Sequence, residues 1–376
     1  MTTSERAQPT LRILVVAPVA PTRGGIAQFS TMLVNTLRLN HMVTCWAIAP
    51  LYPPLLFPGN AMPDDQAAKI TCTIDKRIHG WNPLAWVRCW HGIKRREYDL
   101  VIWQWWTPYW VPFLLLLIAQ SAWRNIPTLA LSHQLVEPDA PDWQAGIARL
   151  MLHCAHGVIQ FGTEEAQHSR HRSLPLPLNG ELIRQSHKHM DIRRQYGISP
   201  IDRVVLCFGF VRRYKGFDII VSAMRHTPPT VHLFIVGEWW HDTNALRTLC
   251  VDSAIADRIH IIDSYIPDAA VADYFAAADV VALPYRSGMV SSVATLAAVS
   301  GVPLLVSAVG ALAGLATVVD VVQPNTPDAW ATALTRVCDV PRVDVVPVPD
   351  QPSWEALQRA IEEIASVCNS ERVGAQ

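Results

Sequence analysis

Two cations in one turn are the residues of this chain best suited to chemistry. Arg212 and Lys215 lie within residues 207–218, where an apolar strand is followed by a turn and then a helix. The first backbone N–H groups of a helix have no partner inside it and carry partial positive charge. Together with the two side chains they predict a pocket for phosphate, and the expected ligand is a diphosphate. The neighbouring Arg213 is expected to be solvated.

A second helix N-terminus follows in residues 282–306, which are predicted to form strand, loop, helix and strand. Ser291 or Ser292 is expected to cap this helix, and Gly301 is expected to end it. The amides of Ser291, Ser292 and Val293 can then hold a further set of phosphate oxygens. Capping alone would also explain the two serines.

Four other residues are placed where a ligand could reach them. Gly24 and Gly25 allow a tight turn in which the backbone can approach a ligand, although a purely structural turn is an alternative. His133 ends a predicted strand at the sheet edge where open α/β sheets bind ligands, and a packing role is its alternative. Glu238 directly follows a strand and can bind a ribose or sugar hydroxyl, or be an ordinary exposed loop acid.

Strands and helices are predicted to alternate along the chain, which is typical of parallel sheets with right-handed crossovers. Residues 172–180 are rich in helix breakers and are expected to form a hinge, and the proline-rich residues 341–352 a second linker. A last helix is predicted over 353–368. Neither half has G-x-G-x-x-G after its first strand, which argues against an NAD enzyme. Strands are expected at 12–17, 43–48, 99–103, 127–131, 157–161, 204–210, 231–236, 259–262, 280–283 and 303–306.

The composition fits a folded protein in a reducing compartment. Half of the 376 residues are apolar and 17% are charged, which excludes a disordered chain, and the net charge of −1 argues against a general nucleic-acid binder. The eight cysteines show no zinc-binding spacing, so a cytoplasmic location is expected. The longest apolar run, 111–119, is too short to cross a bilayer. A segment from 81 to 96 mixes tryptophans with basic residues, which leaves peripheral membrane contact open beside an ordinary sheet-covering helix.

Several motifs resemble those of one family of enzymes. They are F-G-F-V-R-R-Y-K-G at 208–216, V-G-E at 236–238, L-P-Y-R-S-G-M-V-S-S-V at 283–293 and G-V-P-L-L at 301–305. In the amino-terminal half the corresponding segments are 21–29, 98–108 and 129–137. The chain resembles, from about residue 11 to 315, the retaining GT-B glycosyltransferases of family 4, and within them a bacterial subgroup with R-x-Y-K-G.

The resemblance implies an α/β fold of the GT-B type, with two Rossmann-like domains facing across a cleft. Residues 1–180 would form the acceptor domain and 181–345 the nucleotide-sugar donor domain, and the helix in 346–376 would cross back to the first domain. The implied activity moves a sugar from a nucleotide-diphosphate donor to a glycan, lipid or small hydroxylated acceptor, with retention. No cofactor is expected, and no metal, because cationic side chains can replace Mg²⁺ and no D-x-D triplet suggests a metal site.

The resemblance also assigns roles to residues of both halves. Tyr265 and Ile266 would contact the nucleotide base. Membrane association, if present, would be with the cytoplasmic face. The implied catalytic residues are Arg212, Lys215 and His133, and the implied donor-binding residues are Gly24, Gly25, Glu238, Ser291, Ser292 and Val293.

The chain departs from the family pattern at the paired acids. Gly288 and Leu296 occupy the two positions where the family has glutamates, and Gln134 replaces the usual asparagine after His133. A catalytically weakened subunit that binds a nucleotide sugar without turnover is therefore the main alternative. A sugar-nucleotide epimerase is a more distant one, because the loops offer no clear set of carboxylates and histidines for proton abstraction.

Overall fold

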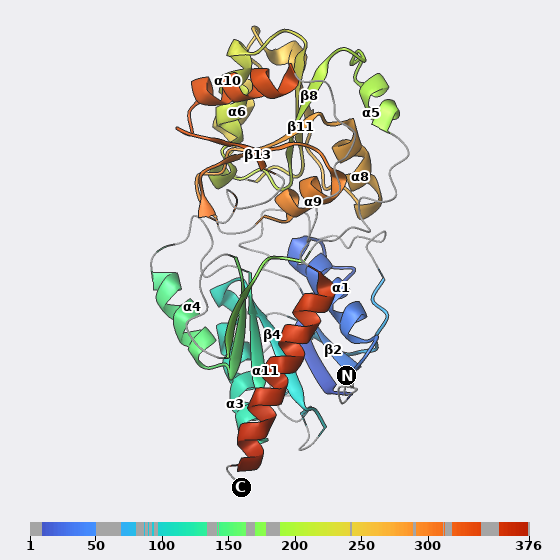
Figure 1. The fold of residues 1–376 in the computed structure, drawn as a ribbon, viewed down its shortest axis with the longest axis vertical. Coiled ribbons are helices and arrows are strands. Elements are labelled where there is room, and N and C mark those ends of the chain that lie inside the picture. The colour runs from blue at the N-terminus through green and yellow to red at the C-terminus, as the bar shows by residue number, and fades with distance from the viewer. Residues whose placement is uncertain are drawn as a thin grey trace, which may run out of the picture.

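The chain folds into two α/β units that lie end to end along the long axis (Figure 1). The longest helix, at the C-terminus, lies alongside the first unit rather than the second. The computed structural model describes residues 10–49, 69–79, 86, 89, 92–93, 97–133, 141, 143–162, 170–177, 189–240, 243–288, 291–310, 312, 318–339 and 353–374.

The first unit contains a parallel sheet of seven strands in the order β3-β2-β1-β4-β5-β6-β7. Its central strands are runs of apolar residues that are buried along most of their length, as a sheet covered on both faces requires. The strands are β1 (Arg12–Ala17), β2 (Met42–Ala49), β3 (Ile74–His79), β4 (Leu100–Trp105), β5 (Thr128–Ser132), β6 (Gly157–Phe161) and β7 (His171–Leu174).

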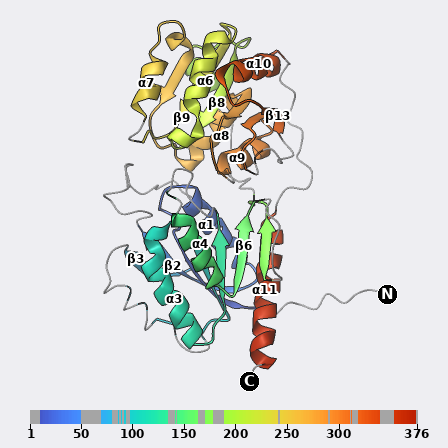
Figure 2. The ribbon, with the colours of Figure 1, turned by 90° about the vertical axis from the view of Figure 1, so that its left-hand side faces the viewer.

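Alternate residues of β1 belong to different cores. Leu14 and Val16 pack with α3 (Val111–Trp123) and α4 (Trp143–His153) on one face of the sheet. Ile13 and Val15 pack on the other face with α1 (Gly25–Leu37) and with the C-terminal helix α11 (Trp354–Gly374). The first unit is therefore a three-layer sandwich, with α11 as part of one helical layer (Figure 2).

The second unit has a parallel sheet of six strands in the order β10-β9-β8-β11-β12-β13, and its buried residues form one large cluster. The strands are β8 (Arg203–Phe208), β9 (Val231–Val236), β10 (Ile259–Ile262), β11 (Val280–Leu283), β12 (Leu304–Ser307) and β13 (Val318–Val322). The helices of four residues or more are α5 (His189–Gln195), α6 (Phe217–Ala223), α7 (Asn244–Cys250), α8 (Asp268–Ala277), α9 (Ser292–Ser300) and α10 (Pro327–Cys338).

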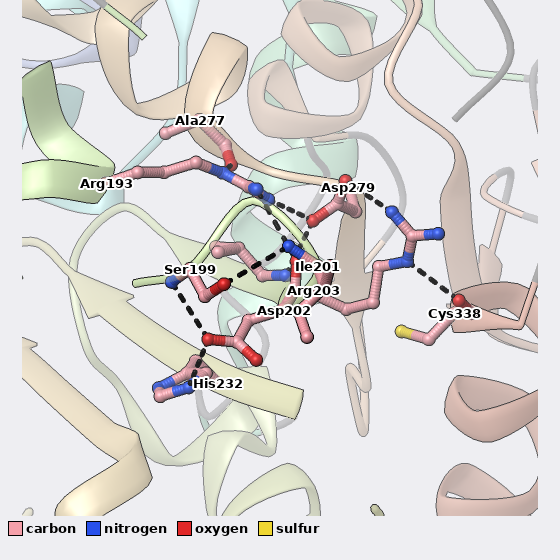
Figure 3. Close-up of polar contacts among 10 residues, drawn as sticks. Arg193, Ser199, Ile201, Asp202, Arg203, His232, Ala277, Asp279 and Cys338 are labelled. Atoms are coloured by element: carbon pink, nitrogen blue, oxygen red, sulfur yellow. Dashed lines mark hydrogen bonds and ion pairs between the residues drawn. The ribbon is translucent and has the colours of Figure 1, made fainter. Parts of the chain in front are cut away.

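A buried ion pair ties α5 to the second sheet (Figure 3). Arg193 pairs with Asp279, and both side chains are 8% exposed. Arg193 Nε also donates to the carbonyl of Ala277 at 3.0 Å, and Asp279 accepts the N–H of Val204 at 2.7 Å. A buried pair is tolerated when further hydrogen bonds satisfy both partners, as here. The ion pair attaches α5 at the edge where β8 and β11 begin, opposite the edge where they end.

The structure confirms the predicted α/β class and its two Rossmann-like sheets, but it contains three strands that the sequence did not predict: β3, β7 and β13. All three lie at sheet edges, where strands are short or carry charges and lack a long apolar run. Residues 172–174, which the sequence placed in the hinge, form most of β7. None of the helices in the described ranges is long and apolar enough to cross a membrane.

Candidate active site between the two sheets

The turn after β8 depends on glycines at defined positions. Gly216 has φ 67°, and a Cβ there would lie 2.1 Å from the carbonyl oxygen of Pro284. Gly237 after β9 has φ 142°, and a Cβ there would lie 2.3 Å from the carbonyl oxygen of Gly209. Because only glycine fits these positions, the loops that end β8, β9 and β11 can pack directly on one another.

Lys215 is buried in this turn, with only 6% of its surface exposed. Its Nζ donates one long hydrogen bond, 3.4 Å, to the carbonyl of Phe208. Burial, and to a smaller extent the nearby charge of Arg212, lower the pKa of Lys215 to about 7. An ammonium group in these surroundings would be stabilised by an anion.

Arg212 stands at the start of the same turn, in extended conformation. Its guanidinium carbon lies 4.8 Å from the ring centroid of Trp240 and 5.2 Å from that of Tyr214. Stacking on aromatic faces holds a guanidinium in place. Arg213 is exposed, as the sequence analysis expected.

The N-terminus of α9 lies next to Lys215. Ser291 is the cap, and its Oγ accepts the N–H of Ala294 at 3.3 Å and shares a 3.2 Å hydrogen bond with the hydroxyl of Tyr285. A Cβ built on Gly209 would lie 2.7 Å from Lys215 Nζ and 3.5 Å from Val293 Cγ2, so both side chains converge on one point. The predicted cation and the predicted helix N-terminus are thus parts of one site.

The N-terminus of α1 approaches the same place from the other domain. A Cβ on Gly25 would lie 3.4 Å from Ser292 Oγ, so these two residues face each other between the domains. Gly24 has φ 112° and occupies the position before the helix. The guanidinium of Arg23 lies 4.5 Å from the ring centroid of Tyr265, which adds a second contact between the domains.

Glu238 lies in the loop after β9, beside the cationic turn. Its carbonyl accepts the N–H of Val211 at 2.9 Å, which joins the two loops, and its side chain is half-buried. Glu238 is predicted to lie near the donor, and the structure brings its backbone to the turn that carries Arg212.

His133 sits at the end of β5, in the first domain and in aromatic surroundings. Its ring meets Phe29 edge-on at 4.6 Å and lies 5.2 Å from the ring of Phe161. Nε2 donates to Gln104 Oε1 at 3.2 Å. Burial lowers the pKa of His133 to about 4, so the ring is neutral at pH 7. These contacts fit a packing residue as well as a ligand-binding one.

Three buried polar atoms at the end of β4 and just after it were not predicted from the sequence. Gln104 Nε2, Trp106 Nε1 and Thr107 Oγ1 are buried and have no hydrogen-bond partner among the described residues. A buried polar atom without a partner costs about 1–3 kcal/mol, which a ligand hydroxyl could recover. The signal in the sequence was Gln104 near the end of an otherwise apolar strand, followed by Thr107 just after it.

The two positions that lack the family's acids differ in their surroundings. Leu296 is 8% exposed and belongs to the core of the second domain. A Cβ on Gly288 would meet nothing within 4 Å, but its φ of 128° disfavours other residues. Within the described ranges no group of three or more His, Cys, Asp or Glu side chains is arranged to hold a metal ion.

Comparison of the sequence with known proteins points to one family. Residues 202–339 match the family described as group 1 glycosyl transferases. A D-inositol 3-phosphate glycosyltransferase of Xylanimonas cellulosilytica is 34% identical over 153 residues, which are 38% of this chain and 36% of the relative. One of Segniliparus rotundus is 31% identical over 147 residues, 37% of this chain and 32% of the relative. The matched part of the chain thus spans about a third of the length of these curated relatives.

Solved structures share the fold over nearly the whole chain. Sucrose-phosphate synthase from Thermosynechococcus elongatus has a TM-score of 0.63 at 19% identity, covering 95% of this chain and 94% of its own. Anabaena Alr3699/HepE in complex with UDP-glucose has a TM-score of 0.64 at 16% identity, covering 96% of this chain and 94% of its own. WaaG, a glycosyltransferase involved in lipopolysaccharide biosynthesis, has a TM-score of 0.58 at 14% identity, covering 94% of both chains. Residues 202–339 therefore resemble the group 1 glycosyl transferases, and the two domains together have the GT-B fold that the sequence predicted.

Proposed function

We propose that this protein transfers a sugar from a nucleotide-diphosphate donor to a hydroxyl group of a glycan, lipid or small acceptor. The observation that carries the proposal is the buried ammonium of Lys215, which lies beside Arg212 and the N-terminus of α9. Burying a cation is costly unless an anion compensates it. The neighbouring positive charge of Arg212 makes the protonated form of Lys215 less favourable still. A diphosphate bound there would remove both costs.

The chemistry follows from where charge develops. When the bond between the anomeric carbon and the phosphate oxygen breaks, its electron pair leaves with the diphosphate. Lys215, Arg212 and the amides of Ser292 and Val293 stabilise this negative charge because they are held in place before the reaction. The acceptor oxygen forms the new bond to the anomeric carbon, and its proton passes to the departing diphosphate oxygen. We propose that this cationic set takes the part of a metal ion, and that the reaction proceeds with retention, as the resemblance implies.

Other residues are proposed to position the substrates. Glu238 would bind the ribose or the donor sugar, because it lies beside the cationic turn. Gly24 and Gly25 would bring the N-terminus of α1 to the donor, and His133 would contact the sugar or acceptor from the first domain. The activities named for the relatives and the UDP-glucose in the Anabaena structure support a nucleotide-sugar donor. A cytoplasmic location would give access to such donors.

A weakened nucleotide-sugar-binding subunit is the second candidate, because Leu296 lies in the core where the family has an acid. Both candidates bind nucleotide, but only the enzyme releases nucleoside diphosphate. The two are separated by following that release from a donor over many turnovers.

The first experiment is a thermal-shift series with UDP, GDP, ADP and their common sugar conjugates, with and without a chelator. Ligand at a hundred times its dissociation constant adds about 2.7 kcal/mol to the free energy of unfolding. The expected result is a shift with one nucleotide that is lost in Lys215→Ala and kept in Arg213→Ala, the exposed cation of the same turn. No shift with any nucleotide, or equal shifts in both variants, would contradict the proposed site.

A further inference from the structure

Helix α3 presents an apolar face to the outside of the first domain. Its outward side chains include Leu115, Leu116 and Trp123, which are 45%, 37% and 67% exposed. The other exposed residues of the helix are Pro112, Ala119 and Ala122, so no exposed position of α3 is polar. A contiguous apolar surface of this kind on a water-soluble domain marks an interaction site.

Helix α4 extends this surface. Both helices are crossovers between neighbouring strands, pack into the same core and lie next to each other on one side of the sheet (Figure 2). On α4, Trp143 and Leu150 are 58% and 62% exposed. The α3/α4 surface, defined by these two side chains and the six exposed ones of α3, therefore carries a tryptophan on each helix.

The charges on these two helices have one sign. Arg124 follows α3 with its guanidinium 4.8 Å from the ring centroid of Trp123, and Arg149 is exposed on α4 next to Leu150. The sequence contains no Asp or Glu from 100 to 136 or from 143 to 163. Tryptophan and arginine beside exposed leucine are the combination that suits the headgroup region of an anionic bilayer.

The dimensions agree with a helix that lies in the membrane plane. Helix α3 has 13 residues and is therefore about 20 Å long, shorter than the hydrocarbon core of about 30 Å. We propose that the α3/α4 surface docks this protein on an anionic membrane, with Leu115, Leu116 and Trp123 among the acyl chains and the two arginines at the phosphates. Of the segment 81–96, on which the sequence analysis based membrane contact, most residues lie outside the described ranges. The docking surface does not depend on the proposed glycosyl transfer.

The test is co-sedimentation of the full chain with phosphatidylcholine vesicles that contain or lack phosphatidylglycerol. Leu115→Ser, Leu116→Ser and Trp123→Ser combined should weaken binding to the anionic vesicles more than ten-fold. The matched control combines Leu39→Ser, Ile201→Ser and Val251→Ser, which are 80%, 77% and 72% exposed and lie elsewhere. This control should bind as the wild type does, and circular dichroism checks that both variants are folded.

A second pair of changes tests the charge. Arg124→Gln and Arg149→Gln should each weaken binding to anionic vesicles about five-fold, the effect of one basic residue near such a surface, and leave binding to neutral vesicles unchanged. The proposal is overturned if wild-type protein does not sediment with anionic vesicles or if the control triple loses binding equally. It is also overturned if the wild type is a dimer that the α3 triple dissociates without any effect on vesicles, because the occupant is then a second copy.

Discussion

Gln28 on α1 and Asp268 at the start of α8 form a hydrogen bond that joins the two domains, with the amide Nε2 donating to Oδ1. Gln28 is in the first turn of α1, as is Gly25, which faces Ser292. Each contact between the domains favours the arrangement in which the N-termini of α1 and α9 meet, and so the arrangement in which the candidate site has both of its walls.

Gln28→Ala should shift the protein toward a more open arrangement of the two domains, because it removes a hydrogen bond to a charged group. Such a bond contributes about 1.5–3 kcal/mol. Small-angle X-ray scattering should show a larger radius of gyration in the absence of nucleotide. Asn35→Ala is the matched control, since Asn35 is on the same helix but bonds Lys69 and Thr71 within its own domain. An unchanged radius in Gln28→Ala would show that the contact does not hold the domains together.

Lys215→Met should raise the stability of the ligand-free protein and abolish nucleotide binding. Methionine fills a similar volume without a charge, so the variant avoids the cost of burying an ammonium group. Urea unfolding at pH 6 and nucleotide titration by calorimetry would measure the two effects. A destabilised variant that still binds nucleotide would show that Lys215 is a structural residue.

Nucleotide affinity should fall as the pH rises above about 7. The pKa of Lys215 is about 7 in the ligand-free protein because the side chain is buried, so the ammonium is lost above that pH. A bound diphosphate favours the protonated form, which raises this pKa in the complex. Between the two pKa values the dissociation constant should increase up to ten-fold per pH unit, and it should change far less with pH in Lys215→Arg.

Acid should destabilise the second domain through a pair of stacked histidines. His232 and His260 lie with Nδ1 and Nε2 3.1 Å apart, and burial lowers both pKa values, that of His260 to about 4. Between the usual value of 6.5 and about 4 the unfolded chain binds more protons than the folded one, so stability falls as the pH falls. The facing charges are Asp202, Asp257, Arg193 and Arg258.

His260→Gln should flatten this dependence of stability on pH, because it removes the histidine whose pKa is lowered more. The midpoint of urea unfolding, measured from pH 7 to pH 4.5, should drop less in the variant than in the wild type. An identical slope would place the acid sensitivity in other groups, of which buried His133 is one.

Alanine substitutions at two glycines should have opposite effects on the free energy of unfolding. Gly237→Ala should destabilise by several kcal/mol, since its Cβ would lie 2.3 Å from a backbone oxygen that cannot move freely. Gly146→Ala, in the middle of α4 with nothing within 4 Å, should stabilise by about 0.5–1 kcal/mol. Chemical denaturation of both variants gives the comparison, and equal effects would show that the packing between Gly237 and Gly209 is not tight.

The sequence by itself determined the features that depend on neighbouring residues. The apolar runs between breakers predicted the central strands, and Ser291 and Gly301 cap the two ends of α9 as expected. The clustering of Arg212 and Lys215 in one turn was visible from their spacing alone. These features are local, because strand formation, capping and turn geometry depend mainly on a few consecutive side chains and backbone groups.

Only the tertiary structure decided the environment of the same residues. The lowered pKa of Lys215 depends on burial against Phe208 and Tyr285, and the neutral state of His133 on burial with Phe29 and Phe161. Gly25 and Ser292 are far apart in the chain, and only the packing of the two domains brings them together. The strands at the sheet edges likewise form only because a neighbouring strand from another part of the chain lies beside them. Burial and proximity are set by how distant elements pack, and no local pattern of residues records that packing.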